Sequence, residues 1–317
     1  MARLGGAAGE GGARRKSPGA LVPVGHARSA ARGPGWRLPL PLPFAGLRSE
    51  LEARLAAVPT TLNEYGLGPF GFAPRYAAPV LLPAVLLYRY WLRVETHGIE
   101  QVRADTVLLT ANHAGNPFAY HGAMLGMAML LEGRPPRIVR GMVEYYLPTI
   151  PFFSTLMHRM GSVVGTPENC TQLLERGECI MVFPEGERGF VKTYRQRYQL
   201  QRFGLGFLRL ALATQTPIVP VGIVGAEEQS PGLLRSRALG RLIGAPVAPI
   251  TLTMPWLGPA GMLPLPVKFH LRFGTPLRFE GDAGAEGAEV ERKVEVVKDA
   301  IRGLIAEGLE ARRGWFR

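Results

Sequence analysis

Two short polar blocks, far apart in the chain, contain the residue types that could do chemistry. The first is Asn112–Pro117 (Asn-His-Ala-Gly-Asn-Pro) and the second is Phe183–Gly186 (Phe-Pro-Glu-Gly). Each follows an apolar or β-branched run typical of a strand. Groups that follow strands on Gly/Pro-rich turns lie at the carboxyl edge of an α/β sheet. His113 is a candidate general base there, because an unperturbed imidazole titrates near neutral pH.

The residues around the second block suggest an anion site. The turn glycines, including Gly186, let the backbone approach a ligand, and a carboxylate with a guanidinium, Glu185 and Arg188, can hold a hydroxyl and a phosphate. Lys192 and the arginines after it continue the positive charge. Such a run can also be one solvated basic face. Its position directly after the carboxylate turn favours the anion site.

Alternating strand and helix patterns predict an α/β fold with a mixed, mostly parallel sheet, crossover helices and short N-terminal helical segments. The predicted strands are Thr106–Thr110, Arg137–Val143, Cys179–Phe183, Ile218–Val224 and Val267–Phe273. The predicted helices between them are Gly122–Leu131, Asn169–Arg176 and Phe203–Ala213, and an amphipathic helix around residues 290–305 follows. Because proline cannot donate to a ladder, Pro220 is expected at a sheet edge or a bulge.

Composition divides the chain into three parts. Residues 1–48 are basic and rich in Ala, Gly, Pro and Arg, without apolar periodicity, so we expect a disordered tail. Residues 49–92 should form a helical or interfacial region in which Ser49 caps the first helix. Residues 93–317 should form the α/β domain.

The apolar runs are not typical of transmembrane helices. Ala77–Leu87 is short and contains prolines, and Ala245–Val267 is long but contains six prolines. Because basic residues flank these runs, we expect them to dock on a membrane surface, although packing inside the protein is the alternative. The flanking residues are Arg235, Arg237, Arg241 and Lys268.

The net charge of +12 favours anionic partners such as nucleic acid, membranes or phosphorylated small molecules. Nucleic acid is disfavoured, because the positive charge lies in the tail and beside an acidic turn, with no recognisable binding motif. Cys170 and Cys179 show no metal-binding or disulfide spacing. We therefore expect no metal and no cofactor.

Two further blocks, Gly161–Asn169 and Pro217–Val221, complete a pattern of four in order. The first of these predicts a turn into a helix capped near Thr166, with Pro167 at its first position. Together the four blocks resemble the glycerolipid acyltransferase family, which includes the lysophosphatidate acyltransferases. The likeness covers roughly residues 90–280, and the four-block pattern is specific.

The chain departs from that family's pattern at two positions. The family's first block places an aspartate five residues after the histidine to orient it, whereas this chain has Phe118 there. His121, slightly further on, is the candidate partner of His113. The second block's arginine is replaced near Pro167, so Arg159, Arg188 or Lys192 would contact the phosphate instead.

The resemblance implies an enzyme that moves a fatty acyl group from acyl-coenzyme A or acyl-carrier protein to a lysophospholipid or related glycerolipid hydroxyl. It would work at the cytoplasmic face of a membrane as a peripheral or monotopic protein. His113 and His121 would be catalytic. The expected substrate-binding residues are Asn112, Asn116, Glu185, Gly186, Arg188 and Lys192. The alternative is a catalytically degraded, lipid-binding relative of the family.

Overall fold

The computed structural model describes residues 42–102, 107–114, 119–143, 153–242, 248–314 and 316. Most of the predicted disordered tail, and the candidate residue Asn116, lie outside these ranges. The first helix, α1 (Leu42–Ala56), begins before Ser49, so the prediction that Ser49 caps it is wrong. The helix therefore includes the last residues assigned to the tail.

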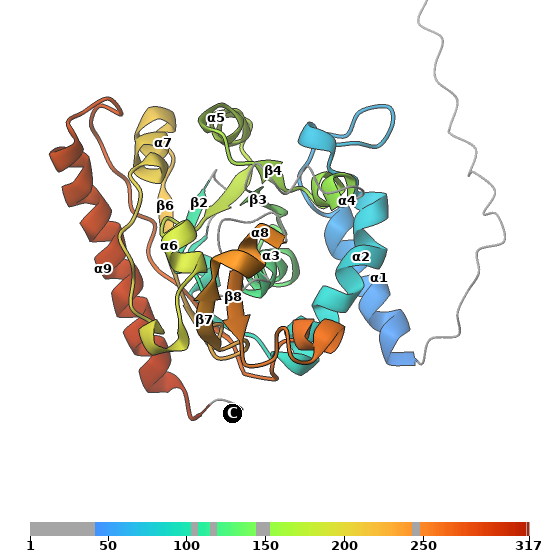
Figure 1. Ribbon diagram of the computed structural model, residues 1–317. Helices are drawn as coiled ribbons and strands as arrows, with labels where there is room; N and C mark the ends of the chain where they lie inside the picture. The colour runs from blue at the N-terminus through green and yellow to red at the C-terminus, as the bar shows by residue number, and fades with distance from the viewer. Residues whose placement is uncertain are drawn as a thin grey trace, which may run out of the picture. The chain divides into compact units, whose positions relative to one another are not determined.

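A seven-stranded sheet, in the order β1-β9-β6-β2-β5-β3-β4, forms the centre of the described chain (Figure 1). Its strands are β1 (Glu95–His97), β2 (Leu108–Ala111), β3 (Val139–Val143), β4 (Val163–Val164), β5 (Cys179–Val182), β6 (Ile218–Val224) and β9 (His270–Phe273). All neighbours pair in parallel except β6 and β9, which are antiparallel. The predicted mixed, mostly parallel α/β class is confirmed, and β1 and β4 are strands that the patterns missed.

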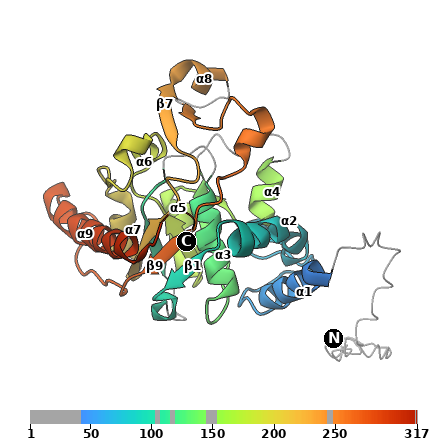
Figure 2. The same cartoon turned by 90° about the horizontal axis from the view of Figure 1, so that it is seen from below.

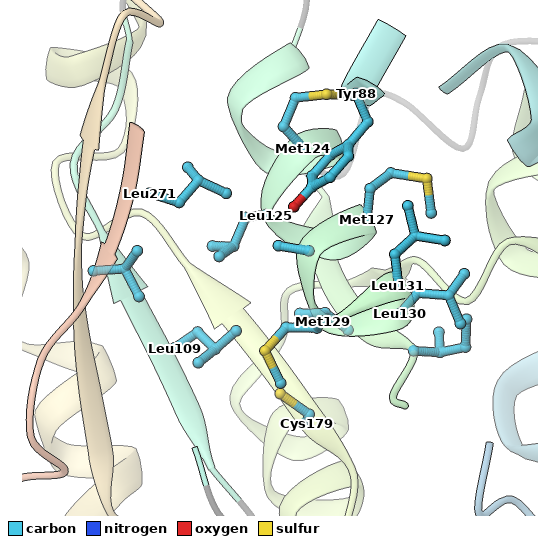
Figure 3. Packing of buried hydrophobic residues seen from close by; sticks show 14 of the residues in the cluster. Tyr88, Leu109, Met124, Leu125, Met127, Met129, Leu130, Leu131, Cys179 and Leu271 are labelled. Atoms are coloured by element: carbon cyan, nitrogen blue, oxygen red, sulfur yellow. The ribbon is translucent and has the colours of Figure 1, made fainter. Parts of the chain in front are cut away.

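Helices cover both faces of this sheet. One face packs against α1, α2 (Pro74–Leu86) and α3 (Tyr120–Leu131), and the other against α5 (Pro167–Glu175), α7 (Gly206–Thr214) and α9 (Gly287–Ala311). Leu108 and Leu109 on β2 point into opposite cores, as the two-residue period of a strand requires. Figure 3 shows Met129 of α3 beside Leu109 of β2, while Met124 of the same helix lies against Tyr88. The strands read as apolar runs because both faces are buried.

Pro220 lies in an interior strand and not at a sheet edge, so of the two expected positions the structure shows the irregular one, where the register with the neighbouring strand shifts. On the β9 side, Ile218 pairs with Leu277, whereas the regular ladder with β9 begins only at Val221. Alternation along the strand turns the nitrogen of Pro220 toward the interval between these pairings. The Pro220 carbonyl still accepts from the Gly274 N–H at 2.8 Å, so only the missing donor falls in the gap.

The apolar run before the sheet forms a helix despite its prolines. Pro79 and Pro83 both lie inside α2, and a wider turn, η2 (Leu87–Trp91), continues the helix to the start of the domain. The expectation that this apolar run is too short to cross a membrane considered Ala77–Leu87 alone, whereas the helical segment extends further at both ends. The segment Pro69–Trp91 is long and apolar enough to cross a membrane by length and composition. Only 28% of its most apolar window is buried.

The second apolar run belongs to a small structure outside the main sheet. Strands β7 (Gly232–Ser236) and β8 (Ala248–Thr251) pair antiparallel, and the helix α8 (Arg237–Leu242) follows β7. A short 3-10 helix, η6 (Gly258–Met262), follows β8 before the chain returns to β9. Figure 2 shows β7 and α8 standing out from the main sheet.

Candidate active site

Asn112 and His113 follow β2 directly, at the carboxyl edge of the sheet. The Asn112 side chain is fully buried, and its amide donates to the Ile223 carbonyl at 3.0 Å and accepts from the Ile223 N–H at 2.8 Å. The amide thus replaces a peptide group and extends the pairing of β2 with β6. The Asn112 side chain therefore holds the loop after β2 in place, and its role in substrate binding stays a prediction.

Glu185 reaches the same loop from the neighbouring strand. Because β2 and β5 are parallel and adjacent, the residues after them meet, and the Glu185 carboxylate accepts from the His113 backbone N–H at 2.8 Å. Its other oxygen accepts from the Gln201 N–H at 2.9 Å. The side chain is 1% exposed, so it is not open to a substrate hydroxyl. The contacts of Glu185 show that it positions the His113 backbone, and its predicted role in substrate binding stays untested.

Lys192 is also buried and has the same kind of role. Its ammonium lies 3.3 Å from the second Glu185 oxygen and 2.6 Å from a carboxylate oxygen of Glu227. All three side chains are almost completely buried. Lys192 is thus a buried ammonium already paired with two carboxylates, and the predicted phosphate contact at Lys192 stays untested.

The buried polar network extends away from His113 toward the end of α9. Glu227 accepts from the Tyr198 N–H, and the Tyr198 hydroxyl donates to Glu228. Glu228 also pairs with Arg312 at 2.9 Å. Burial raises the pKa of Glu227 to about 7, and nearby Lys192 opposes this effect. The network thus links the catalytic loop to three separate segments of the chain.

His113 and His121 come together as the sequence suggested. Their ring centroids are 4.7 Å apart and the planes are tilted by 52°, with the Phe183 ring against both. Burial, followed by the charge of Lys192, lowers the pKa of His113 to about 3. Burial, followed by His113 and Lys192, also lowers the pKa of His121 well below its usual range. Both imidazoles are therefore neutral at neutral pH, which is the form in which His113 can accept a proton.

Two glycines allow the chain to turn closely around His113. Gly186 has φ +54° and ψ −137°, a backbone conformation that residues other than glycine rarely adopt. A Cβ at Gly189, in the short helix α6 (Glu187–Phe190), would lie 2.5 Å from the Cβ of His113 and 2.7 Å from that of Glu185. The absence of a side chain at Gly189 therefore lets α6 cover the catalytic loop.

Arg188 is the predicted ligand that remains accessible. It is exposed and lines an open hollow of about 450 Å³ together with Pro184, Gly186, Val191 and Gly204. Arg159 instead stacks on the Tyr76 ring of α2, at 4.3 Å from its centroid. The exposed backbone of Gly186 and the guanidinium of Arg188 are thus the predicted binding groups that face this hollow.

Sequence reasoning missed the roles of Gln201, Gly189 and Glu227. Glu227 lies three residues after the end of β6, and the pair Glu227-Glu228 was a usable signal because two acids so close to a buried strand are rarely left unpaired. The main-chain contact of Gln201 has no sequence signal, since any residue except proline offers the same N–H.

A group of metal-capable side chains lies elsewhere in the described part of the chain. Donor atoms of Glu95, His97 and His270 are within 4.8 Å of one another on β1 and β9. The Lys268 ammonium forms an ion pair with the Glu95 carboxylate at 2.8 Å. Strand β6 separates this group from β2, so it does not contribute to the His113 site.

A family model and several known proteins are similar in sequence to this chain. Residues 93–224 match the family model described as Acyltransferase. An uncharacterized protein of Mycobacterium leprae (strain TN) is 35% identical over 292 residues, which cover 90% of this chain and 78% of that protein. The chain therefore belongs to the acyltransferase family.

Two more distant similarities are to proteins whose names state an activity. The mouse protein named DGAT1/2-independent enzyme synthesizing storage lipids is 24% identical over 225 residues, covering 68% of this chain and 60% of that protein. The crystal structure of the 1-acyl-sn-glycerophosphate (LPA) acyltransferase PlsC from Thermotoga maritima matches with a TM-score of 0.47 and 19% identity. That match covers 76% of this chain and 84% of PlsC.

Proposed function

We propose that this protein moves a fatty acyl group from acyl-coenzyme A or acyl-carrier protein to a hydroxyl of a lysophospholipid or related glycerolipid. The observation that carries the proposal is the meeting of the two polar blocks, in which Glu185 holds the backbone of His113 at 2.8 Å. This contact fixes a neutral imidazole at the carboxyl edge of the sheet. Family membership supports acyl transfer, and the names of the more distant relatives support a lipid acceptor.

The reaction requires one base and no covalent enzyme intermediate. His113 takes the proton of the acceptor hydroxyl as that oxygen attacks the thioester carbonyl. The carbon–sulfur bond then breaks, the acyl group remains on the acceptor oxygen, and the proton passes from His113 to the leaving thiolate. Arg188 at the open hollow is placed to hold the acceptor phosphate. The acceptor would be presented at the cytoplasmic face of a membrane.

The test is a thiol-release assay with purified protein, acyl-coenzyme A and a panel of acceptors that includes lysophosphatidate and a monoacylglycerol. The proposal predicts thiol release that depends on the acceptor and yields an acylated glycerolipid. Arg188→Ala should raise the KM of a phosphate-bearing acceptor and leave that of monoacylglycerol unchanged. Acceptor binding without any thiol release would instead support the non-catalytic, lipid-binding alternative.

A further inference from the structure

We propose that an apolar arm of this chain, formed by Leu252, Trp256, Leu257, Met262 and Leu263, inserts into an anionic lipid surface beside the active site. All five side chains are exposed, with Trp256 at 67% and Leu263 at 61%. Five large apolar side chains crowded into twelve residues exceed the scattered exposure usual on a protein surface. The proposal concerns how the proposed acyl acceptor reaches the site.

The backbone of the arm is suited to an apolar surrounding, because many of its polar groups are hydrogen-bonded within the protein. The Thr253 hydroxyl donates to the Gly261 carbonyl at 3.0 Å, and the Leu252 N–H donates to the Pro231 carbonyl at 2.9 Å. The buried Thr251 hydroxyl accepts from the Met254 N–H at 2.9 Å. A segment whose polar groups are already paired enters lipid at a lower cost than an open loop.

Hydrogen bonds attach the arm to η2 and to α3, the helix that carries His121. The Trp91 indole N–H, at the end of η2, donates to the Pro264 carbonyl at 2.7 Å. The Tyr120 hydroxyl, at the start of α3, donates to the Met262 carbonyl at 2.8 Å. The next residue on α3, His121, has its ring centroid 4.7 Å from that of His113. A lipid at the arm would therefore be close to the catalytic histidine pair.

The positive charge around the arm indicates that the surface it enters is an anionic lipid surface. Residues 229–279 contain six lysines and arginines and no aspartate or glutamate. Arg237 and Arg241 are exposed on α8, next along the chain from β7, whose Leu233 and Leu234 are also exposed. Apolar and aromatic side chains flanked by arginines are typical of interfacial attachment to anionic membranes.

The experiment measures binding of the full-length protein to two kinds of vesicle, pure phosphatidylcholine and phosphatidylcholine with phosphatidylglycerol. Leu257→Asp and Trp256→Asp should each lower the partition coefficient at least about tenfold, because a charge replaces a side chain that favours the apolar phase. The matched control is Val296→Asp, since Val296 is also half-exposed but lies on α9. It should bind as the wild type does.

A second pair of substitutions tests the role of the arginines. Arg237→Gln/Arg241→Gln should weaken binding to the anionic vesicles about fivefold per charge and leave binding to neutral vesicles unchanged. Wild-type binding to vesicles by Leu257→Asp, or no vesicle binding by the wild type, overturns the proposal. So does a wild-type dimer that Leu257→Asp dissociates in the absence of vesicle binding, since the arm would then contact a second copy.

Failure of the arm proposal can be separated from failure of the proposed function. The Leu257→Asp variant should acylate a water-soluble, short-chain acceptor at the wild-type rate and lose rate only with acceptor in vesicles. If the wild type acylates no acceptor, the proposed function fails while the vesicle-binding result still decides the arm.

Discussion

Replacing Lys192 with methionine should destabilise the protein and misplace the catalytic loop at the same time. Lys192 lies between the carboxylates of Glu185 and Glu227, at 3.3 and 2.6 Å. Methionine fills a similar volume but leaves Glu185 and Glu227 buried without their shared cation, at a pH above about 7 where Glu227 is ionised. The Glu185 carboxylate would then accept from the His113 N–H without a neighbouring positive charge to neutralise it.

The expected magnitude follows from the burial of the three side chains, which are at most 4% exposed. Removing one partner from a buried ion pair costs about 3–5 kcal/mol, because the remaining charge stays out of water. At about 2–4 °C per kcal/mol for a protein of this size, the Tm should fall by about 6–20 °C. A displacement of His113 by about 1 Å would lower turnover about a hundredfold.

The assay is thermal unfolding monitored by calorimetry, and acyl transfer is measured at a temperature below the unfolding transition. Arg202→Met is the matched control, because the Arg202–Glu291 pair is 2.9 Å long but mostly exposed. It should cost about 0.2–1 kcal/mol at most. Adding Glu227→Gln to Lys192→Met should restore part of the lost stability, since one buried charge is removed. A Lys192→Met protein with wild-type Tm and turnover would refute the positioning role.

Three further substitutions test other parts of the site. His121→Asp should keep or raise the rate and move the acid limb of the pH–rate profile to higher pH, because a carboxylate raises the pKa of His113 from about 3; a slower enzyme with an unmoved limb would argue against the pairing. Asn112→Ala should cost about 2–4 kcal/mol of stability, because it leaves two buried backbone groups of Ile223 unpaired; unchanged denaturant unfolding would contradict this. Glu227→Gln should gain stability relative to wild type as pH rises from 4.5 to about 7, since the folded carboxyl stays protonated in that range whereas the unfolded one ionises; parallel stability curves would exclude the raised pKa.

The sequence predicted the fold class, the principal strands and the meeting of the two polar blocks. Those predictions succeed because buried strands form continuous apolar runs and parallel strands bring their carboxyl ends together. The cap of α5 was also correct, since Thr166 accepts from the Asn169 N–H at 3.1 Å ahead of Pro167. Local chemistry of that kind is readable from adjacent residues.

The errors concern burial and long-range pairing, which a local pattern does not contain. Glu185 and Lys192 looked like surface ligands because charged residues usually face solvent. Only the tertiary fold shows that they neutralise each other, with Glu227 from after β6 completing the group. The length of the apolar helical segment was likewise underestimated, because α2 and η2 continue one another across Pro79 and Pro83.

The most direct test of the account is a single-turnover measurement of acyl transfer by His113→Ala with both substrates saturating. The account predicts a fall of about a hundredfold or more, because the general base is absent, with acceptor affinity and Tm close to wild type. A variant that retains more than about a tenth of the wild-type rate, while folded and substrate-bound, would contradict the role of His113 as the base.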